Sequence, residues 1–139
     1  MADPTSASGA AQAIAVSALR AQQGRMRIIA ENLANAGSTS RTAGGDPYRR
    51  QAPVFAPTPV AGGTGVKMAR VEPDKTAFKS DYEPGNPSAN AQGYVKLSNV
   101  DPLIEAMDMR EAQRAYEANL NVIETARAMD MRTLDLLKR

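Results

Sequence analysis

Apolar side chains recur at helical spacing near the start of the chain. The positions follow one another in steps of four, three, four, three and four residues, with one polar residue among them: Ala15, Leu19, Gln22, Met26, Ile29 and Leu33. This heptad spacing is typical of a helix that packs against another helix. It predicts a helix within residues 10–36.

A longer stretch with similar periodicity follows Asp101. Asp101 suits an N-cap and Pro102 suits the first helical position, where the missing N–H costs nothing. At ~1.5 Å per residue, the stretch predicts a rod of roughly 55 Å. One face of this rod carries Met109, Ala112, Tyr116, Ile123, Ala126 and Leu137, with Leu120 and Leu134 beside it. The pattern predicts a long helix within residues 98–139.

The segment between the two periodic stretches has a different composition. Residues 37–97 are rich in Gly, Pro, Ser and Thr, and neither a helical nor a strand period persists there. We expect short extended pieces, of which 66–72 is the best strand candidate, then a turn-rich loop at 82–93 and a short strand at 94–97. The sequence leaves the conformation of 52–65 open. Residues 1–9 are small and polar, and we expect them to be disordered.

These elements predict the fold class. The middle segment has too few apolar residues to cover both helices, so the simplest solution pairs the helices with each other. The fold is therefore expected to be mainly α, with long N- and C-terminal helices packed antiparallel as a coiled-coil-like pair. Residues 10–36 and 98–139 would form a discontinuous helical domain, and 37–97 an extended or hairpin-like middle region. The shorter helix leaves part of the longer stripe uncovered, which implies an intermolecular partner.

Gly24 interrupts the first predicted helix. A glycine inside a helix costs ~1 kcal/mol relative to alanine. It is either a tolerated weak point or a place where another helix packs closely.

The composition excludes much catalytic chemistry. The chain has no His and no Cys, so a Ser-His-Asp triad and thiolate metal sites are impossible. Glu105, Asp108 and Glu111 form an acidic patch, which complements the helix dipole and lacks converging metal ligands. We expect no catalytic, cofactor-binding or metal-binding residues, no cofactor and no small-molecule substrate.

Charge is distributed unevenly. The net charge is +2, but residues 1–70 hold eight Lys or Arg against three Asp or Glu, and residues 71–139 hold nine against twelve. The halves either attract each other, within or between chains, or are ordinary solvated faces. Tyr48 with Arg49 and Arg50 forms a small basic and aromatic cluster. Because nucleic-acid binding needs a wider basic face, we expect a contact to an acidic protein neighbour and no nucleic acid.

No apolar run of ~20 residues occurs, so we expect no membrane span. Asp3 lies where a secretory signal would be basic, and no continuous apolar region follows it. An extracytoplasmic protein with this sequence would need a different export route.

Three segments together resemble one family. They are AENLANAGST at residues 30–39, GDPYRRQ at 45–51, and the long segment 82–126, which contains YEPGNPSA, GYVKLSNV and EAQRAYEAN. In this order they resemble the bacterial flagellar rod and hook proteins, and among these the FlgC-like proximal rod family. The resemblance covers about residues 10–51 and 66–139.

The resemblance implies a non-enzymatic structural subunit of the flagellar basal-body rod, the drive shaft that transmits torque for motility. It implies three kinds of partner: other copies of the chain, other rod proteins, and the basal adaptor at the export gate. It also implies a location in the rod within the periplasmic space. Export would occur through the flagellar type III apparatus without a cleaved signal peptide.

Periodicity and resemblance together give a set of candidate interface residues. The candidates for helix packing are Leu19, Met26, Ile29, Asn32, Leu33, Asn35, Met109, Tyr116, Asn119, Leu120 and Ile123. Tyr48, Arg49 and Arg50 are candidates for a loop contact between subunits, although their own subunit is the other possible partner. The alternative function is a soluble helical adaptor or secretion-associated protein that binds one partner through the same stripes. A rod subunit would form an array of several copies, whereas an adaptor would form a small closed complex.

Overall fold

The computed structural model describes residues 6–139, so the expectation for residues 1–5 lies outside the described residues. The chain forms two compact units. Unit 1 comprises Met1–Met26, Val54–Arg70 and Arg110–Arg139, and unit 2 comprises Arg27–Pro53 and Val71–Met109. Both helices and both strands of the first hairpin contribute residues to each unit.

The first helix, α1, spans Ala7–Ala34, close to the predicted range. It begins three residues earlier than predicted because Ser6 acts as its N-cap. The Ser6 hydroxyl accepts a hydrogen bond from the Gly9 N–H at 3.0 Å, which satisfies one of the free donors of the first turn. Residues 7–9 are therefore helical and not disordered. At the other end, the Asn35 side-chain amide donates to the Glu31 carbonyl at 2.8 Å.

The second helix, α2, spans Pro102–Leu137 and confirms the predicted start. The Asp101 carboxylate accepts hydrogen bonds from the backbone N–H groups of Leu103, at 3.0 Å, and Ile104, at 3.4 Å. Asp101 is thus the N-cap, and Pro102 occupies the first helical position. Residues 98–101 precede the helix and are not part of it.

The middle region holds more regular structure than the sequence predicts. Strands β1 (Gln51–Val60) and β2 (Gly63–Pro73) form a two-stranded sheet. They join at a tight turn in which Gly62 has a φ of 80°, a conformation that glycine adopts without steric cost. The stretch 52–65, left open by the sequence, is therefore most of a β-hairpin.

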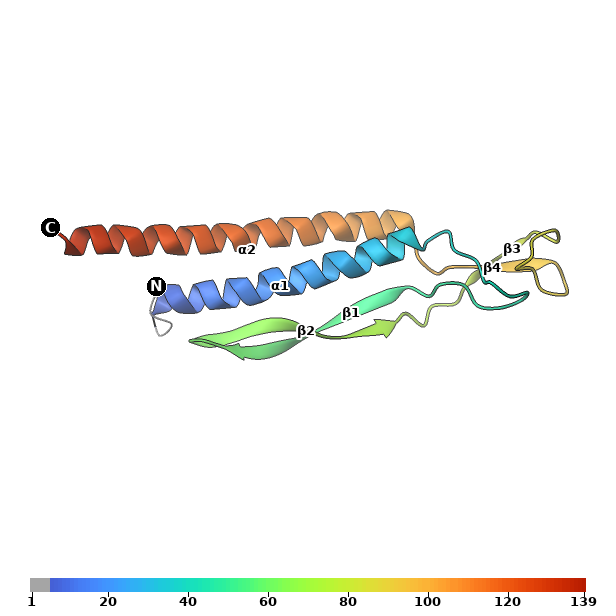
Figure 1. Ribbon diagram of the computed structural model, residues 1–139, viewed down its shortest axis with the longest axis horizontal. Helices are drawn as coiled ribbons and strands as arrows, with labels where there is room; N and C mark the ends of the chain where they lie inside the picture. Colours follow the sequence, from blue (N-terminus) through green and yellow to red (C-terminus); the bar gives the residue numbers. More distant parts are fainter. Residues whose placement is uncertain (1–5) are drawn as a thin grey trace. The chain divides into compact units, whose positions relative to one another are not determined.

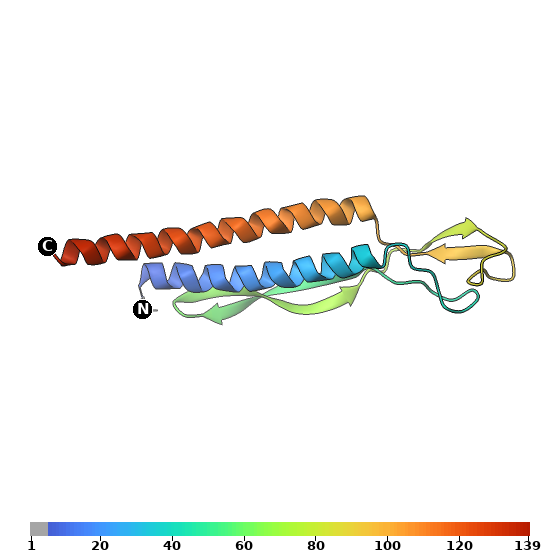
Figure 2. The ribbon, with the colours of Figure 1, turned by 45° about the horizontal axis from the view of Figure 1, so that its top comes forward.

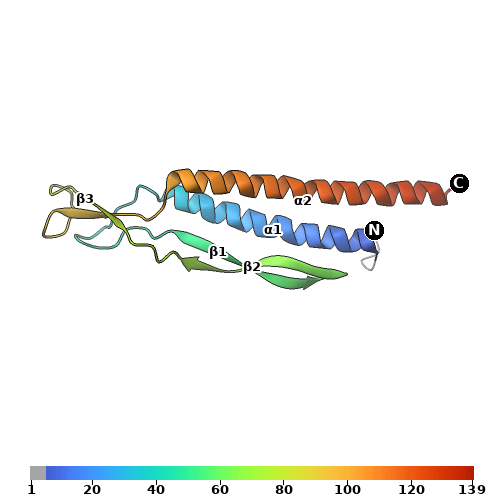
Figure 3. The ribbon, with the colours of Figure 1, turned by 180° about the vertical axis from the view of Figure 1, so that it is seen from behind.

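A second, smaller hairpin lies within unit 2 (Figure 3). Strands β3 (Lys79–Tyr82) and β4 (Tyr94–Leu97) pair antiparallel, with Tyr82 opposite Tyr94. The two tyrosine rings meet edge to face with their centroids 5.2 Å apart. The loop between the strands returns through Gly93, which has a φ of 86°. The predicted turn-rich loop at 82–93 is observed from residue 83 onward, and the predicted strand at 94–97 is confirmed.

Within unit 1, helix α1 lies between α2 and the β1–β2 hairpin (Figures 1 and 2). Small and aliphatic side chains form the buried apolar positions of this unit: Ala15, Ala21, Ala112, Ile123 and Ala126. In unit 2 the corresponding positions are Ile28, Ile29, Val95 and Val100. The predicted class, long terminal helices with a small β-containing middle region, is observed in this coarse form.

Candidate functional site

The most heavily buried polar groups of the described residues belong to unit 2. Asn32 near the end of α1 is 1% exposed, and Glu105 in the first turn of α2 is 0% exposed. Burying an amide or a carboxylate is costly unless hydrogen bonds and counter-charges replace water. Both residues therefore require partners from other segments, and the loop at residues 48–51 supplies most of them.

Asn32 ties that loop to the helix. Its side-chain carbonyl accepts hydrogen bonds from the Tyr48 hydroxyl at 2.8 Å and from the Gln51 N–H at 2.9 Å. Its side-chain amide donates to the Gln51 carbonyl at 2.8 Å and to Glu105 Oε2 at 3.3 Å. Asn32 thus matches both backbone groups of Gln51, as a neighbouring strand would.

Arg50 is the counter-charge of Glu105. Its Nε donates to Glu105 Oε1, its Nη1 lies 3.3 Å from Asp74 Oδ2, and its Nη2 lies 3.7 Å from Asp108 Oδ2. The planar guanidinium can serve three carboxylates because its five donors point in fixed, different directions. We call Asn32, Tyr48, Arg50, Asp74, Glu105 and Asp108 the Arg50 cluster.

The ionisation of these groups follows from their surroundings. Burial acts to lower the pKa of Arg50, but the hydrogen bond and charge of Glu105, together with Asp74, outweigh it and hold that pKa above its ordinary value. Hydrogen bonds from the side chain and backbone of Thr76, followed by the charge of Arg50, hold the pKa of Asp74 below its ordinary value. Burial raises the pKa of Tyr48. At neutral pH the cluster therefore holds a charged arginine and a neutral tyrosine.

Arg49 secures a different segment of the same unit. Its Nη1 donates to the carbonyls of Asp74 at 2.7 Å and Thr76 at 3.1 Å. Its guanidinium carbon lies 4.1 Å from the centroid of the Phe78 ring, a cation–π geometry. Tyr48, Arg49 and Arg50, the candidates for a loop contact, thus have their polar groups engaged inside their own unit.

Sequence reasoning assigned Glu105 and Asp108 to an acidic patch and missed their pairing with Arg50. A signal was available in the spacing. Glu105 lies four residues before Met109, so it continues the stripe of Met109, Ala112 and Tyr116. A carboxylate at a position that the helix period marks as buried indicates an ion pair.

The predicted helix-packing residues fall into two groups. In unit 2, Ile29 and Asn32 are buried, and Leu33, Asn35 and Met109 are half-buried. In unit 1, Ile123 is buried, and Leu19, Met26, Tyr116 and Asn119 are half-buried. Leu120 differs from these residues, because it is 39% exposed while Ile123 is 7% exposed.

Three polar contacts join α1 to α2 within unit 1. The Ser8 hydroxyl donates to the Ala126 carbonyl at 3.3 Å, and the Gln12 side chain donates to Asp130 Oδ2 at 3.1 Å. Arg25 Nη2 lies 3.4 Å from Glu111 Oε2. Between them lies Gln22, whose Oε1 is the one buried side-chain polar atom without a hydrogen-bond partner among the residues described. The polar break in the heptad is thus a weak point of this packing.

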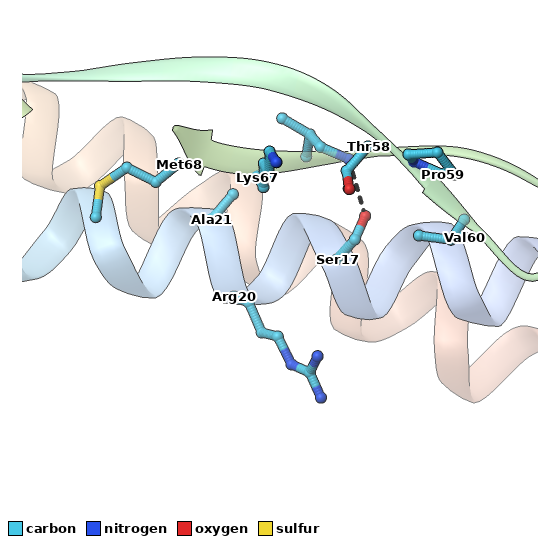
Figure 4. Close-up of a pocket in the computed structure, with 9 residues that line it drawn as sticks. Ser17, Arg20, Ala21, Thr58, Pro59, Val60, Lys67 and Met68 are labelled. Atoms are coloured by element: carbon cyan, nitrogen blue, oxygen red, sulfur yellow. Dashed lines mark hydrogen bonds between the residues drawn. The ribbon is translucent and has the colours of Figure 1, made fainter. Parts of the chain in front are cut away.

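The opposite side of α1 packs against the β1–β2 hairpin, a contact that sequence reasoning missed. The Ser17 hydroxyl accepts a hydrogen bond from the Val66 N–H at 3.1 Å and donates to the Ile14 carbonyl at 2.6 Å. A cavity of about 300 Å³ lies beside this contact, and Arg20 points away from the hairpin (Figure 4). A β-carbon built on Gly24 would lie 3.1 Å from the Met68 methyl group. Gly24 therefore marks a close approach, but of a strand side chain and not of a helix.

Residues 6–139 contain no group of three or more acidic, histidine or cysteine side chains placed to hold a metal ion. Neither helix, in the part that the structure describes, is long and apolar enough to cross a membrane. The features that remain are a buried polar cluster and long, partly covered helices. Long helices with partly covered apolar faces favour association with other chains.

Comparison with known proteins identifies the class. Residues 91–136 match the family described as the C-terminal region of the flagellar basal body rod proteins FlgEFG. A FlgC flagellar basal-body rod protein of Agrobacterium fabrum is 48% identical over 138 residues, which cover 98% of this chain and 97% of that protein. The corresponding protein of Escherichia coli is 45% identical over 125 residues, and that of Borreliella burgdorferi is 40% identical over 144 residues. These alignments cover 88% and 90% of this chain, and 92% and 94% of the relatives.

The class is therefore the structural proteins of the flagellar basal body. Within it, the chain belongs to the FlgC family of flagellar basal-body rod proteins. Its role is structural and not enzymatic, and its place is the rod of the basal body.

Proposed function

We propose that this chain builds the wall of the rod with its two terminal helices, paired antiparallel, and transmits torque through their packing. The observation that carries the proposal is the full-length similarity to FlgC rod proteins, together with helices whose apolar surface is only partly covered. In this proposal the helical residues form one structural domain, and the region between them forms a second.

The polar contacts in unit 1 support the antiparallel pairing. Ser8, near the start of α1, bonds to Ala126, whereas Arg25, further along α1, pairs with Glu111. Gln12, also near the start of α1, bonds to Asp130. The start of α1 thus meets later positions of α2, and the later part of α1 meets an earlier one. Six of the buried or half-buried residues of α2 follow one another in steps of three and four, as a coiled-coil-like seam requires: Met109, Ala112, Tyr116, Asn119, Ile123 and Ala126.

A second face of α2 is not covered in the described part of the chain. Ala118, Val122, Met129 and Leu136 are all exposed, and the exposed fractions of Met129 and Leu136 are 59% and 71%. Val122, Met129 and Leu136 follow one another at intervals of seven residues, so they lie on one face of the helix. A repeated apolar stripe in water favours association with another helix. We propose that neighbouring rod subunits, copies of this chain or other rod proteins, cover it.

The proposal extends to delivery and folding. A long helix with uncovered apolar faces gains most of its stability from packing against neighbours. Docking at the growing end of the rod would therefore complete the folding of α2. Export through the flagellar type III apparatus and contact with a basal adaptor at the export gate fit a chain that completes its fold after export.

The test compares Val122→Asp with Asn121→Asp in living cells. Val122→Asp places a charge on the uncovered stripe, whereas Asn121→Asp places the same charge on the adjacent exposed position. We expect Val122→Asp to abolish motility and incorporation into basal bodies while the free chain keeps its unfolding midpoint. Asn121→Asp should have little effect on either. Normal rods in a motile Val122→Asp strain would contradict the proposal, and electron microscopy of labelled basal bodies would separate an array of copies from a small closed complex.

A further inference from the structure

A cleft of about 690 Å³ opens on unit 2 beside the Arg50 cluster. Apolar side chains form one part of its lining, namely Ala77, Leu97, Val100 and Ile104. Ile104 is itself exposed, so an apolar surface faces water at the mouth of the cleft. The cleft is thus an apolar site without a cover in the described residues.

The charge around the cleft is negative. Three carboxylates line it, those of Asp74, Asp101 and Glu105, against two cations, Arg50 and Lys79. Arg50 pairs with Glu105 and Asp74, so these three groups together carry one net negative charge, and Asp101 balances Lys79. Ala36 and Gly37, in the turn directly after α1, also line the cleft. The last turn of α1 contains no basic side chain. The partial negative charge at this helix terminus is therefore not compensated from within α1.

The last turns of α2 have the complementary chemistry. Residues 131–139 are all exposed, and Leu137 is 78% exposed. Leu134 and Leu137 are one turn apart on a common face of the helix. The basic residues Lys138 and Arg139 follow directly. An apolar face that ends in two positive charges matches an apolar cleft surrounded by excess carboxylates.

We propose that the cleft of one copy receives the last turn of α2 from a second copy. Leu134 and Leu137 of the second copy pack on Val100 and Ile104, and Lys138 and Arg139 approach Asp74, Asp101 and the turn that follows α1. The contact is heterologous, because a tail on one copy meets a cleft on the next, so it generates a ring or a helical array and not a closed pair. This inference rests on the proposed function, because it supplies a contact between successive subunits of the rod.

The chain has no Cys, so single cysteines test the contact cleanly. A strain that expresses Ile104→Cys and Leu137→Cys chains together is treated with a short bismaleimide crosslinker, and its basal bodies are isolated. The matched control replaces Ile104→Cys with Ser80→Cys, an exposed position on β3 of the same unit that does not line the cleft. We expect several-fold more crosslinked dimer with Ile104→Cys than with the control.

A second test reverses the two charges at residues 138 and 139. Lys138→Glu with Arg139→Glu in the Leu137→Cys chain should lower the yield of crosslinked dimer several-fold, because it turns attraction into repulsion. If Ile104→Cys does not fold, Ala77→Cys offers a second exposed position in the lining. Basal bodies that contain the chain but show no excess of dimer over the control overturn the docking proposal and leave the proposed function intact. Basal bodies without the chain overturn both.

Discussion

Unit 1 and unit 2 are each stabilised from within, and the kind of internal contact differs between them. Unit 2 contains the Arg50 cluster, in which Arg50 faces three carboxylates and Asn32 matches the backbone of Gln51. Unit 1 contains long elements whose buried positions are small or aliphatic, such as Ala112, Ile123 and Ala126. Buried polar groups join the segments of unit 2, whereas the buried side chains of unit 1 are small or aliphatic and its polar contacts lie nearer the surface.

The difference also concerns what each unit leaves exposed. In unit 1, α2 exposes large apolar side chains along most of its length, among them Leu120, Val122, Met129 and Leu136. In unit 2, the buried polar groups find partners within the unit. Its exposed large hydrophobic side chains lie at the start of α2, at Leu103, Ile104 and Met107, and in the strands, at Val71, Tyr82 and Tyr94. Unit 1 therefore leaves a long apolar surface uncovered within the described residues, whereas unit 2 pairs its buried charges internally.

Arg50→Ala should produce the largest loss of stability. It leaves Glu105 buried without its main counter-charge, and breaking a buried ion pair costs about 3–5 kcal/mol. Hydrogen exchange should show that the loop at 45–51 and the first turn of α2 lose protection together. The matched control is Arg41→Ala, which removes an exposed arginine from the same unit and should change stability by less than about 0.5 kcal/mol. Equal unfolding midpoints for the two variants would show that the Arg50 cluster does not hold unit 2 together.

Ile123→Ala should have the next largest effect and is specific to unit 1. Ile123 is buried, and removing its side-chain carbons leaves a cavity between packed elements, at a cost of about 2–4 kcal/mol. Leu120→Ala is the control, because Leu120 lies three residues away on α2 but is exposed. Urea unfolding of the free chain should show a clear shift for Ile123→Ala and almost none for Leu120→Ala. A larger shift for Leu120→Ala would mean that the packed stripe of α2 is misassigned.

The burial of residues along α2 shows how much of the helix packing the sequence could predict. The helix period identified Met109, Ala112, Tyr116, Ile123 and Ala126 as one stripe, and all five are buried or half-buried. It also placed Leu137 on that stripe and Leu120 and Leu134 beside it, yet all three are exposed. Periodicity shows which positions share a face, but it does not show where the covering helix ends or how wide the contact is.

The loop residues show the other limit of the sequence. The sequence identified Tyr48, Arg49 and Arg50 as a basic and aromatic cluster and predicted that it contacts an acidic neighbour. The acidic partners of Arg50 are Asp74, Glu105 and Asp108, which lie at least 24 positions further along the chain. No local pattern joins such distant positions. Only the helical period of α2 indicated such a pairing, because it places Glu105 on the apolar stripe.

The smallest expected effect is the change in the stability of unit 2 when the pH is lowered. The pKa of Asp74 is held below its ordinary value of 3.8 by Thr76 and then by Arg50, so its ionised form stabilises unit 2. A carboxylate of this kind contributes fully above its unfolded pKa, and the contribution is lost as the pH falls through the folded pKa. Asp74→Asn keeps a group that can hydrogen-bond to Thr76 and removes the charge. The difference in unfolding free energy between the natural chain and Asp74→Asn should therefore be constant near neutral pH and shrink below about pH 4.

Asp135→Asn is the reference for this measurement, because Asp135 lies on an exposed part of α2 in unit 1. Its difference from the natural chain should be close to zero, because an exposed carboxylate contributes little to stability. The comparison separates an effect of the Arg50 cluster from a general effect of net charge. If Asp74→Asn and Asp135→Asn follow the same curve between pH 7 and about pH 3, Asp74 adds nothing beyond net charge. The stability of unit 2 would then come from the contacts of Glu105 and Asn32, and Asp74 would not belong to the stabilising part of the Arg50 cluster.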